Sequence, residues 1–207
     1  AQSISKPVAA TAALRLVEAN KLSLDVNVNE YLKSWKAPEN SFNSEEKVTL
    51  RRIVSHSAGF TVGGFPGYRL NDSIPTLMQI LDGEKPANSP PIRVDTLPGS
   101  IPRYSGGGFM VMQQLLIDLT GESFPALMKR LVLQPAGMKL STYEQPLREA
   151  RRKETASGHD AEGGVMNGKW PIHPEWAAAG LWTTPTELAQ WALEIANAWG
   201  GRSSKLL

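Results

Sequence analysis

Apolar residues recur at helical spacing directly after Ser3. Pro7 lies near the start of this stretch, where the missing backbone amide costs little. The pattern predicts an alanine-rich, largely buried helix that ends near Asn20. Its apolar positions are Val8, Ala9, Ala12, Ala13, Leu16 and Val17.

The remaining helices are predicted from the same periodicity together with residues that start or stop a helix. Thr49 is typical of an N-cap, and Gly83 and Gly121 are typical of C-terminal ends. Residues 184–187 read Thr-Pro-Thr-Glu, which predicts a capping box with proline at the first helical position. The predicted helices cover residues 29–32, 50–55, 75–82, 109–119, 124–133 and 188–199.

Two long stretches lack helical periodicity. Residues 84–102 are rich in proline, which excludes a regular element there. Residues 146–174 are polar and charged, so any strands in them are expected to be short. The run Gly106-Gly107-Gly108 is expected to form a turn before the helix that begins at Phe109.

Composition narrows the functional class. The chain has 207 residues, 41% of them hydrophobic, which is enough for one sizeable core. Its 22 Lys and Arg residues nearly balance 20 Asp and Glu residues, so the one-signed field of a nucleic-acid binder is absent from the sequence. The basic run at residues 148–153 is interrupted by Glu149 and has no accompanying aromatic ladder, which favours a solvated surface.

Other classes are excluded by residues that the sequence lacks. Without cysteine there is no disulfide, thiolate nucleophile or Cys-ligated zinc, and the histidines have no metal-type spacing. No run approaches the roughly 18 apolar residues of a membrane span, and no signal-type stretch is present. Because the helical pattern starts abruptly after Ala1-Gln2-Ser3, we expect an upstream segment to be missing.

Candidate chemistry begins with Ser3-Ile4-Ser5-Lys6, a Ser-x-x-Lys sequence. On a helix this spacing places the two side chains about 60° apart and roughly 4.5 Å apart along the axis. A serine hydroxyl becomes a nucleophile when a neighbour takes its proton, and a partly desolvated lysine is able to do so. Backbone amides at a helix start would also stabilise a developing oxyanion.

The same spacing has a structural interpretation that stays open at this point. Ser3 is a suitable N-cap residue, and the stem of Lys6 is long enough to bring its amine to solvent. Ser44-Glu45-Glu46-Lys47 is a second Ser-x-x-Lys, in a charged stretch that resembles a solvated turn or helix start. The motif alone is therefore weak.

Tyr104-Ser105-Gly106 supplies a second group that handles protons. It follows a proline-rich loop and precedes a predicted helix, so the phenol of Tyr104 is expected on a structured turn. Acyl transfer requires such a group, because the leaving group must be protonated as its bond breaks. A surface tyrosine in a turn is the structural alternative.

These segments resemble the class C β-lactamases and the related esterases and D-alanyl-D-alanine peptidases, within the serine β-lactamase and penicillin-binding-protein family. The nucleophile segment is residues 1–8, and the matching segments that follow it come in the family's order. They are Leu22-Ser23-Leu24-Asp25, Val48-Thr49-Leu50-Arg51, Ser55-His56-Ser57-Ala58-Gly59, Tyr104-Ser105-Gly106-Gly107-Gly108-Phe109, Pro135-Ala136-Gly137-Met138 and Ala179-Gly180-Leu181-Trp182-Thr183-Thr184.

The resemblance implies an α+β fold of the β-lactamase/transpeptidase type. Residues 1–207 would be one incomplete serine β-lactamase-like catalytic domain, covering mainly the helical portion and lacking most of the flanking antiparallel sheet. Such a piece is expected to self-associate or to depend on a complementary chain, because apolar surface that the strands would cover is left open.

The resemblance also implies the roles of individual residues. Ser3 would be the nucleophile, and Lys6 and Tyr104 would share the general acid and base work, without a decision on which of them acts first. Ser105, Gly106 and Trp182 would contact substrate, although a core aromatic is the alternative for Trp182.

Two departures from the family pattern bear on substrate choice. The third family motif, a Lys- or His-x-Gly, is missing from the chain. Gly106 stands where lactamases usually carry asparagine, so a side-chain contact to the substrate amide is lost. We expect glycine to leave space there for a bulkier acyl group.

The sequence therefore predicts a serine hydrolase with a covalent acyl-enzyme, no metal and no organic cofactor, acting on small carboxylic esters. A β-lactamase or D-alanyl-D-alanine carboxypeptidase, with a β-lactam or peptide substrate, is the close alternative. A non-catalytic binding module is the alternative from another class. The resemblance favours the periplasm or the exterior, whereas composition leaves the compartment open.

Overall fold

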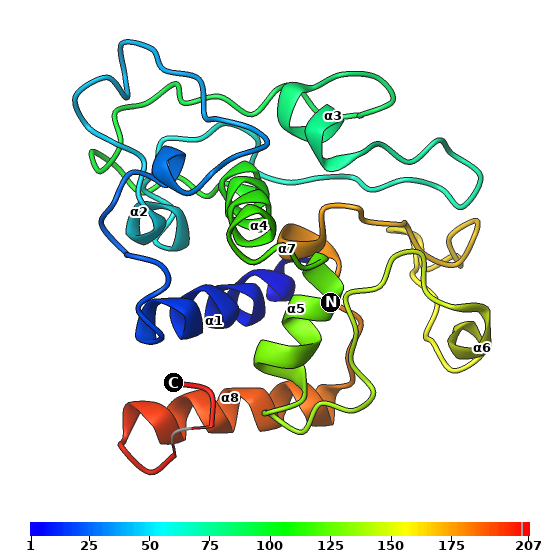
Figure 1. Ribbon diagram of the computed structural model, residues 1–207. Coiled ribbons are helices and arrows are strands. Elements are labelled where there is room, and N and C mark those ends of the chain that lie inside the picture. Colours follow the sequence, from blue (N-terminus) through cyan, green and yellow to red (C-terminus); the bar gives the residue numbers. More distant parts are fainter. Residues whose placement is uncertain (204) are drawn as a thin grey trace.

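The regular elements are helices joined by long irregular segments in the computed structural model, which describes residues 1–203 and 205–207 (Figure 1). Short 3₁₀ turns cover Gln2–Ile4 and Val28–Glu30, and a π-helical turn covers Lys129–Leu133. The α-helices are α1 (Ser5–Glu18), α2 (Leu50–Val54), α3 (Leu77–Asp82), α4 (Gly106–Thr120), α5 (Phe124–Met128), α6 (Glu149–Arg152), α7 (Trp176–Ala179) and α8 (Pro185–Trp199).

Within the described ranges there is no β-strand, only isolated bridges between single residues. Any strands in residues 146–174 were expected to be short, and the segment holds the single turn of α6 and isolated bridges such as Tyr68–Ile172. Its polar sequence offers no alternating apolar face that a sheet would bury. The expectation that the chain covers the helical portion of its fold is confirmed.

Helix α4 is the centre of the core. Its residues from Gly106 to Leu116 are all buried, and it packs against α2, α3, α5 and α7. Helix α1 lies below it in Figure 1 and packs against α7, α5 and the π-helical turn. Helix α8 lies along the lower edge, where Trp191 donates a hydrogen bond to Thr11 at 3.2 Å.

Small side chains allow α1, α4 and α7 to approach one another closely. Ala9, Ala12 and Ala13 of α1 are completely buried, and the Ala177–Ala179 run of α7 is buried against them and α4. In α4 the amide oxygen of Gln113, itself fully buried, accepts the backbone N–H of Ala177 at 2.8 Å. This bond fixes α7 along the axis of α4.

The glycine run at residues 106–108 was expected in a turn and instead forms the first turn of α4. The loop before it takes up the free amides: Gly106 and Gly107 donate to the backbone carbonyls of Gly63 and Val62, and Gly108 donates to the Ser105 hydroxyl. A Cβ on Gly107 would lie 2.5 Å from the Thr61 carbonyl oxygen. The glycines therefore allow this loop to pack closely against α4, and this packing outweighs the low helix propensity of glycine.

Most predicted helix ends are confirmed. The hydroxyl of Thr49 accepts the N–H of Arg52, and Gly83 and Gly121 end α3 and α4 in left-handed conformations. Two boundaries differ, because α3 begins at Leu77 after a complete capping box at Thr76, and residues 124–133 divide into α5 and the π-helical turn. The short element expected at 29–32 is the 3₁₀ turn at Val28–Glu30.

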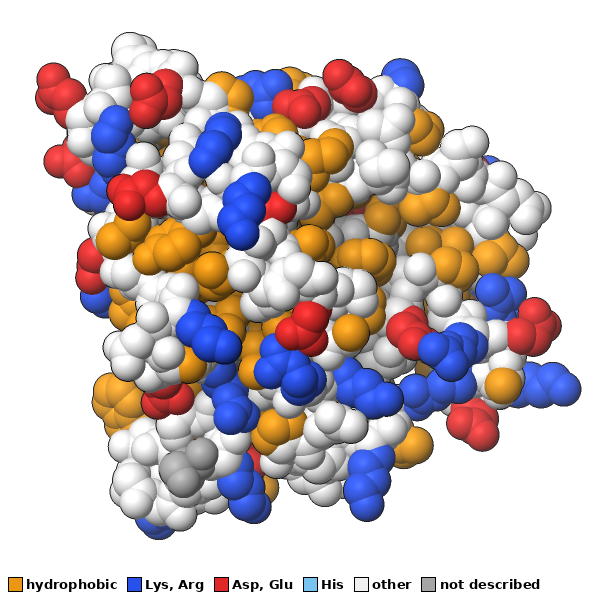
Figure 2. All heavy atoms as spheres, in the orientation of Figure 1, with side chains coloured by type: hydrophobic (Ala, Val, Ile, Leu, Met, Phe, Trp, Pro, Cys, Tyr) orange, Lys and Arg blue, Asp and Glu red, His pale blue; other side chains and the backbone are white. Residues whose placement is uncertain are grey.

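Charged side chains of both signs and apolar side chains share one face of the molecule (Figure 2). Figure 2 shows acidic and basic side chains interspersed on one face, with hydrophobic side chains between them. No helix in the described part of the chain is long and apolar enough to cross a membrane.

The predicted capping box of α8 is only half formed. Thr184 accepts the N–H of Glu187 at 3.2 Å as expected. The Glu187 carboxylate turns away from the cap and instead accepts the Leu140 N–H at 2.8 Å and the Ser141 hydroxyl at 2.6 Å. Glu187 is buried and ties α8 to the segment that precedes α6.

We therefore expect Glu187→Ala to lower the free energy of unfolding of the complete gene product by about 2 kcal/mol, since a buried N–H and a hydroxyl lose a charged acceptor. The measurement is urea-induced unfolding. Gln190→Ala, on an exposed position of the same helix, is the matched control and should change stability by less than about 0.5 kcal/mol. Equal effects of the two substitutions would contradict the assigned role of Glu187.

Candidate active site

Ser3 and Lys6 lie together at the start of the alanine-rich helix. Ser3 is in the 3₁₀ turn that runs directly into α1, and Lys6 is in the first turn of α1. The Lys6 ammonium donates a hydrogen bond to the Ser3 Oγ at 3.0 Å. Ser3 is exposed whereas Lys6 is only 4% exposed, so a substrate can reach the hydroxyl while the amine stays behind it.

The Lys6 ammonium makes its other contacts with neutral groups. It donates to the Ala178 carbonyl oxygen of α7 at 2.9 Å. It also lies 4.9 Å from the ring centroid of Tyr104 and 5.9 Å from that of Phe109. Ring faces and a carbonyl dipole attract a cation without neutralising it.

The structure brings Tyr104, remote in sequence, to the same place. Its phenol is 49% exposed, on the turn before α4. Partial burial raises the pKa of the phenol, but hydrogen bonding to the Lys6 and Ser3 side chains and the Lys6 charge outweigh it, so the pKa of Tyr104 lies below its ordinary value. The geometry therefore favours a phenol that exchanges protons more readily than an ordinary tyrosine.

The second Ser-x-x-Lys sequence makes no such pair. The Lys47 amine donates to the backbone carbonyl of Ser44, not to its hydroxyl, and forms an exposed ion pair with Glu39 at 3.4 Å. It is a solvated turn, as the structural interpretation of this copy predicted.

Ser105 and Gly106 lie next to Tyr104 but are buried in the helix start. The Ser105 hydroxyl accepts from the Gly108 N–H at 3.0 Å and donates to the Thr61 carbonyl at 2.9 Å. A Cβ on Gly106 would lie 3.0 Å from the Gly63 carbonyl oxygen and 3.1 Å from the Phe65 ring. The expectation of free space at Gly106 was therefore wrong, because the Gly63–Phe65 loop lies against it. The contact of Ser105 with substrate stays a prediction.

Trp182 lines a cavity of about 440 Å³ beside the start of the chain. Gln2, the residue before Ser3, lines the same cavity, and so does Trp170, whose ring meets that of Trp182 edge-on at 5.3 Å. Trp182 is held by backbone hydrogen bonds to Thr142 in both directions. The two tryptophans thus form an apolar wall next to the serine segment.

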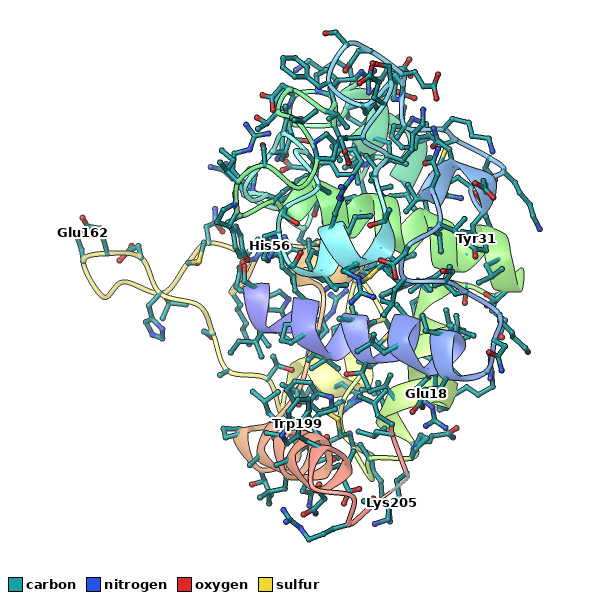
Figure 3. All side chains as sticks on the ribbon, turned by 90° about the vertical axis from the view of Figure 1, so that its left-hand side faces the viewer. Glu18, Tyr31, His56, Glu162, Trp199 and Lys205 are labelled. Carbon is teal, nitrogen blue, oxygen red and sulfur yellow. The ribbon has the colours of Figure 1, made fainter. Side chains whose placement is uncertain are left out.

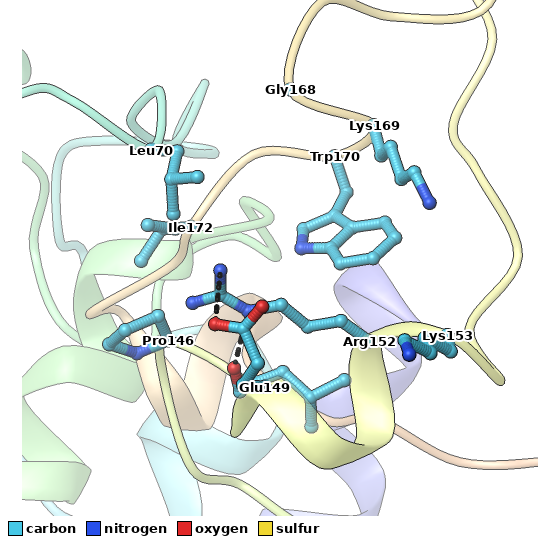
Figure 4. Close-up of a pocket in the computed structure, with 10 residues that line it drawn as sticks. Leu70, Pro146, Glu149, Arg152, Lys153, Gly168, Lys169, Trp170 and Ile172 are labelled. Atoms are coloured by element: carbon cyan, nitrogen blue, oxygen red, sulfur yellow. Dashed lines mark hydrogen bonds and ion pairs between the residues drawn. The ribbon is translucent and has the colours of Figure 1, made fainter.

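A second cavity of about 350 Å³ also has Trp170 in its lining (Figure 4). Leu70 and Ile172 line it on the apolar side, and Arg152 and Glu149, paired at 3.9 Å, lie opposite Trp170 in the close-up. Trp170 is therefore shared by both hollows, and only the first contains residues of the serine segment.

Several residues of the site gave no signal in the sequence. The buried Ser5 side-chain hydroxyl accepts a hydrogen bond from the Leu181 N–H at 2.9 Å. The Ser5 backbone carbonyl accepts one from the Tyr143 hydroxyl at 2.8 Å. The Gln2 amide contacts His173 Nε2 at 3.1 Å, and Nδ1 of that ring lies 3.5 Å from the fully buried Glu175 carboxylate. These contacts hold the serine segment against residues 173–182.

Comparison with known proteins places this geometry in a family. A family model described as "Beta-lactamase" matches residues 1–205. The chain belongs to the beta-lactamase family. Esterase EstB of Burkholderia gladioli is 30% identical over 152 residues, which are 66% of this chain and 36% of EstB.

Two solved structures share the fold. EstCE1, "a hydrolase with promiscuous acyltransferase activity", superposes with a TM-score of 0.73 at 22% identity, covering 100% of this chain and 59% of that one. A beta-lactamase/D-alanine carboxypeptidase from Yersinia pestis, complexed with citrate, has a TM-score of 0.67 at 18% identity, covering 93% and 52%. The chain thus spans little more than half of these structures and about a third of EstB.

The Lys6–Tyr104 contact predicts a measurable titration. In Lys6→Met the hydrogen bond and positive charge that lower the phenol's pKa are gone while its burial persists, so the pKa of Tyr104 should rise and the phenolate should form at higher pH. The measurement is phenolate absorbance during alkaline titration of the complete gene product, after subtraction of the Tyr104→Phe curve.

Lys139→Met, which removes an exposed lysine elsewhere, is the control and should leave the Tyr104 titration unchanged. An unchanged titration in Lys6→Met as well would show that the two groups do not interact.

Proposed function

We propose that the complete protein is a serine hydrolase that forms an acyl-enzyme on Ser3 and acts as a carboxylesterase on small esters. The observation that carries the proposal is the 3.0 Å hydrogen bond between the Lys6 amine and the Ser3 hydroxyl, with the Tyr104 ring 4.9 Å from the same amine. Acyl transfer needs an accessible hydroxyl and neighbouring groups that accept and donate protons, and Ser3 has two such groups beside it.

Acylation follows from these positions. The Ser3 Oγ attacks the ester carbonyl carbon while its proton passes to the member of the Lys6–Tyr104 pair that is deprotonated, either the neutral amine or the phenolate. The tetrahedral intermediate then collapses, the bond to the alkoxide breaks, and the pair returns the proton to the leaving alcohol. Water repeats the sequence on the acyl-enzyme, which releases the carboxylic acid and restores the Ser3 hydroxyl.

The helix start supports stabilisation of the oxyanion. Ser3 lies in the 3₁₀ turn that leads into α1, and the first amides of a helical segment have no intrahelical acceptor. The dipole of α1 has the sign that favours a negative charge developing at this end of the helix.

Three observations support an ester as substrate. Gly106 offers no side-chain amide to a lactam or peptide carbonyl, and an alkoxide leaves more readily than an amide nitrogen. The relative with 30% identity is itself named an esterase. The cavity beside Gln2 and Trp182, of about 440 Å³, has the size and the apolar wall that a small acyl group requires.

We further propose that residues 1–207 are part of one catalytic domain. Most of the buried apolar residues form one cluster, which extends from Val8 in α1 to Leu206. Self-association or a complementary chain stays a prediction for this piece when it is isolated.

Covalent labelling tests the nucleophile. Ser3→Ala should abolish labelling of the complete gene product by a fluorophosphonate, because only the attacking oxygen is lost. Ser44→Ala, in the exposed second Ser-x-x-Lys sequence, is the matched control and should label like the parent protein. Labelling that survives Ser3→Ala and disappears in Ser44→Ala would refute the assignment, and a parent protein that takes no label would support a binding module.

Substrate preference tests the ester assignment. Short-chain p-nitrophenyl esters should be hydrolysed with kcat/KM on the order of tenfold or more above that for cephalosporins, since about 1.4 kcal/mol of missing amide recognition corresponds to tenfold. Comparable kcat/KM values, together with labelling by a penicillin, would favour the β-lactamase or carboxypeptidase alternative.

A further inference from the structure

His56 lies in the loop that follows α2, against the turn that carries Tyr104. Its ring centroid is 4.4 Å from that of Tyr104, with 31° between the planes, and 5.3 Å from that of Phe109. Figure 3 labels His56 close to the N-terminal end of α1, where Ser3 and Lys6 are. The His56 imidazole therefore packs against one side of the Tyr104 phenol.

Two hydrogen bonds join His56 to the residues on either side of Tyr104. The Ser105 backbone N–H donates to His56 Nδ1 at 3.1 Å, and the Arg103 backbone N–H donates to the His56 carbonyl oxygen at 2.6 Å. The backbone on both sides of Tyr104 is thereby anchored to a single residue. A shift of His56 would move the phenol relative to Lys6.

We propose that His56 is the positioning residue for Tyr104, and that it acts as a neutral imidazole whose unprotonated Nδ1 accepts the Ser105 N–H. The inference rests on the proposed function only for its effect on catalysis. The placement of Tyr104 over the Lys6 amine is a separate consequence that does not require activity.

The protonation state of the His56 ring follows from the hydrogen bond that its Nδ1 accepts. An imidazolium carries N–H groups on both nitrogens, so its Nδ1 would face the Ser105 N–H donor to donor. Burial first, and then the charge of Lys6, hold the pKa of His56 below its ordinary value, which keeps the acceptor available at neutral pH.

Charged and titratable groups reach His56 from two sides. Lys6 approaches from α1 and disfavours the imidazolium, and the tilted Tyr104 ring packs against His56 from the turn. The Arg103 guanidinium points away, to Asp95 and the Gly59 carbonyl. When pH falls through the lowered pKa of His56, the ring gains a proton, the Ser105 bond is lost, and the Tyr104 turn loosens.

Two substitutions of His56 distinguish the role of its hydrogen-bond acceptor from the role of its aromatic ring. His56→Phe keeps an aromatic wall and loses the acceptor. His56→Asn loses the ring but offers Oδ1 to the Ser105 N–H, and asparagine also tolerates the φ of 56° at this position. Ser55→Ala, in the same loop, is the control for a general disturbance. Circular dichroism and thermal melting of the complete gene product check that each variant is folded.

The first readout is activity on p-nitrophenyl acetate. His56→Phe should lower kcat by roughly 10- to 100-fold with KM within about twofold, since a misplaced proton donor affects the chemical step. His56→Asn should recover most of kcat and lose the acidic limb of the pH profile. In a Tyr104→Phe background, His56→Phe should have little further effect.

The second readout is the phenolate titration of Tyr104, which needs no turnover. In His56→Phe the pKa of Tyr104 should rise toward its ordinary value as the phenol leaves Lys6, and in His56→Asn it should stay low. A titration and a kcat that His56→Phe leaves unchanged, or equal losses in the folded Phe and Asn variants, would overturn the inference. If the parent protein proves inactive, the titration still decides the role of His56, while the proposed function fails separately.

Discussion

The buried ammonium group of Lys6 is the constraint on which the site depends. A cation with only 4% exposure requires acceptors at fixed positions, because burial removes the water that would otherwise solvate it. The Ala178 carbonyl, the Ser3 hydroxyl and the Tyr104 ring supply that solvation, and they come from α7, the first turn of the chain and the turn before α4. Three segments distant in sequence therefore have to meet around one amine.

Small residues make that meeting possible. α1 and α7 present alanine at their contact, and α4 begins with three glycines whose amides are taken up by the 61–63 loop and by Ser105. A side chain on Gly107 would push this loop away, and with it the turn that holds Tyr104. The glycine run is thus a packing device, and the same packing leaves no free space at Gly106. The ester preference that we propose therefore rests on the missing amide donor rather than on room for a larger acyl group.

Local geometry explains which features were predictable from the sequence. Helical spacing makes the Ser3–Lys6 pair possible, but the same spacing at Ser44 and Lys47 gives no such pair, so the helix start at Ser3 is also needed. The ends at Thr49, Gly83 and Gly121 follow from the conformations these residues favour. Tyr104 is far from Ser3 in sequence, so only family resemblance connected the two. The Ala178 carbonyl and the His56 contacts were not predictable, because a backbone oxygen has no residue signature and a stacking partner is chosen by the fold. The Glu187 carboxylate left its predicted cap because two buried donors outside the helix compete for it.

In the mechanism we propose, Lys6 and Tyr104 have different roles in proton transfer because they differ in solvent exposure. A leaving alcohol departs on the open side of Ser3, and the group that protonates it has to reach that side. Lys6 is buried and already donates to Ser3 and Ala178, whereas half of the Tyr104 phenol is open to solvent. Tyr104 is therefore the group placed to deliver the proton, and Lys6 is placed to keep a positive charge beside it. Since that charge also lowers the pKa of the phenol, the buried cation and the exposed phenol act as one unit. Such a unit works only while the turn at Tyr104 holds its distance from Lys6, and for that reason a residue that never touches the substrate can matter to the chemistry.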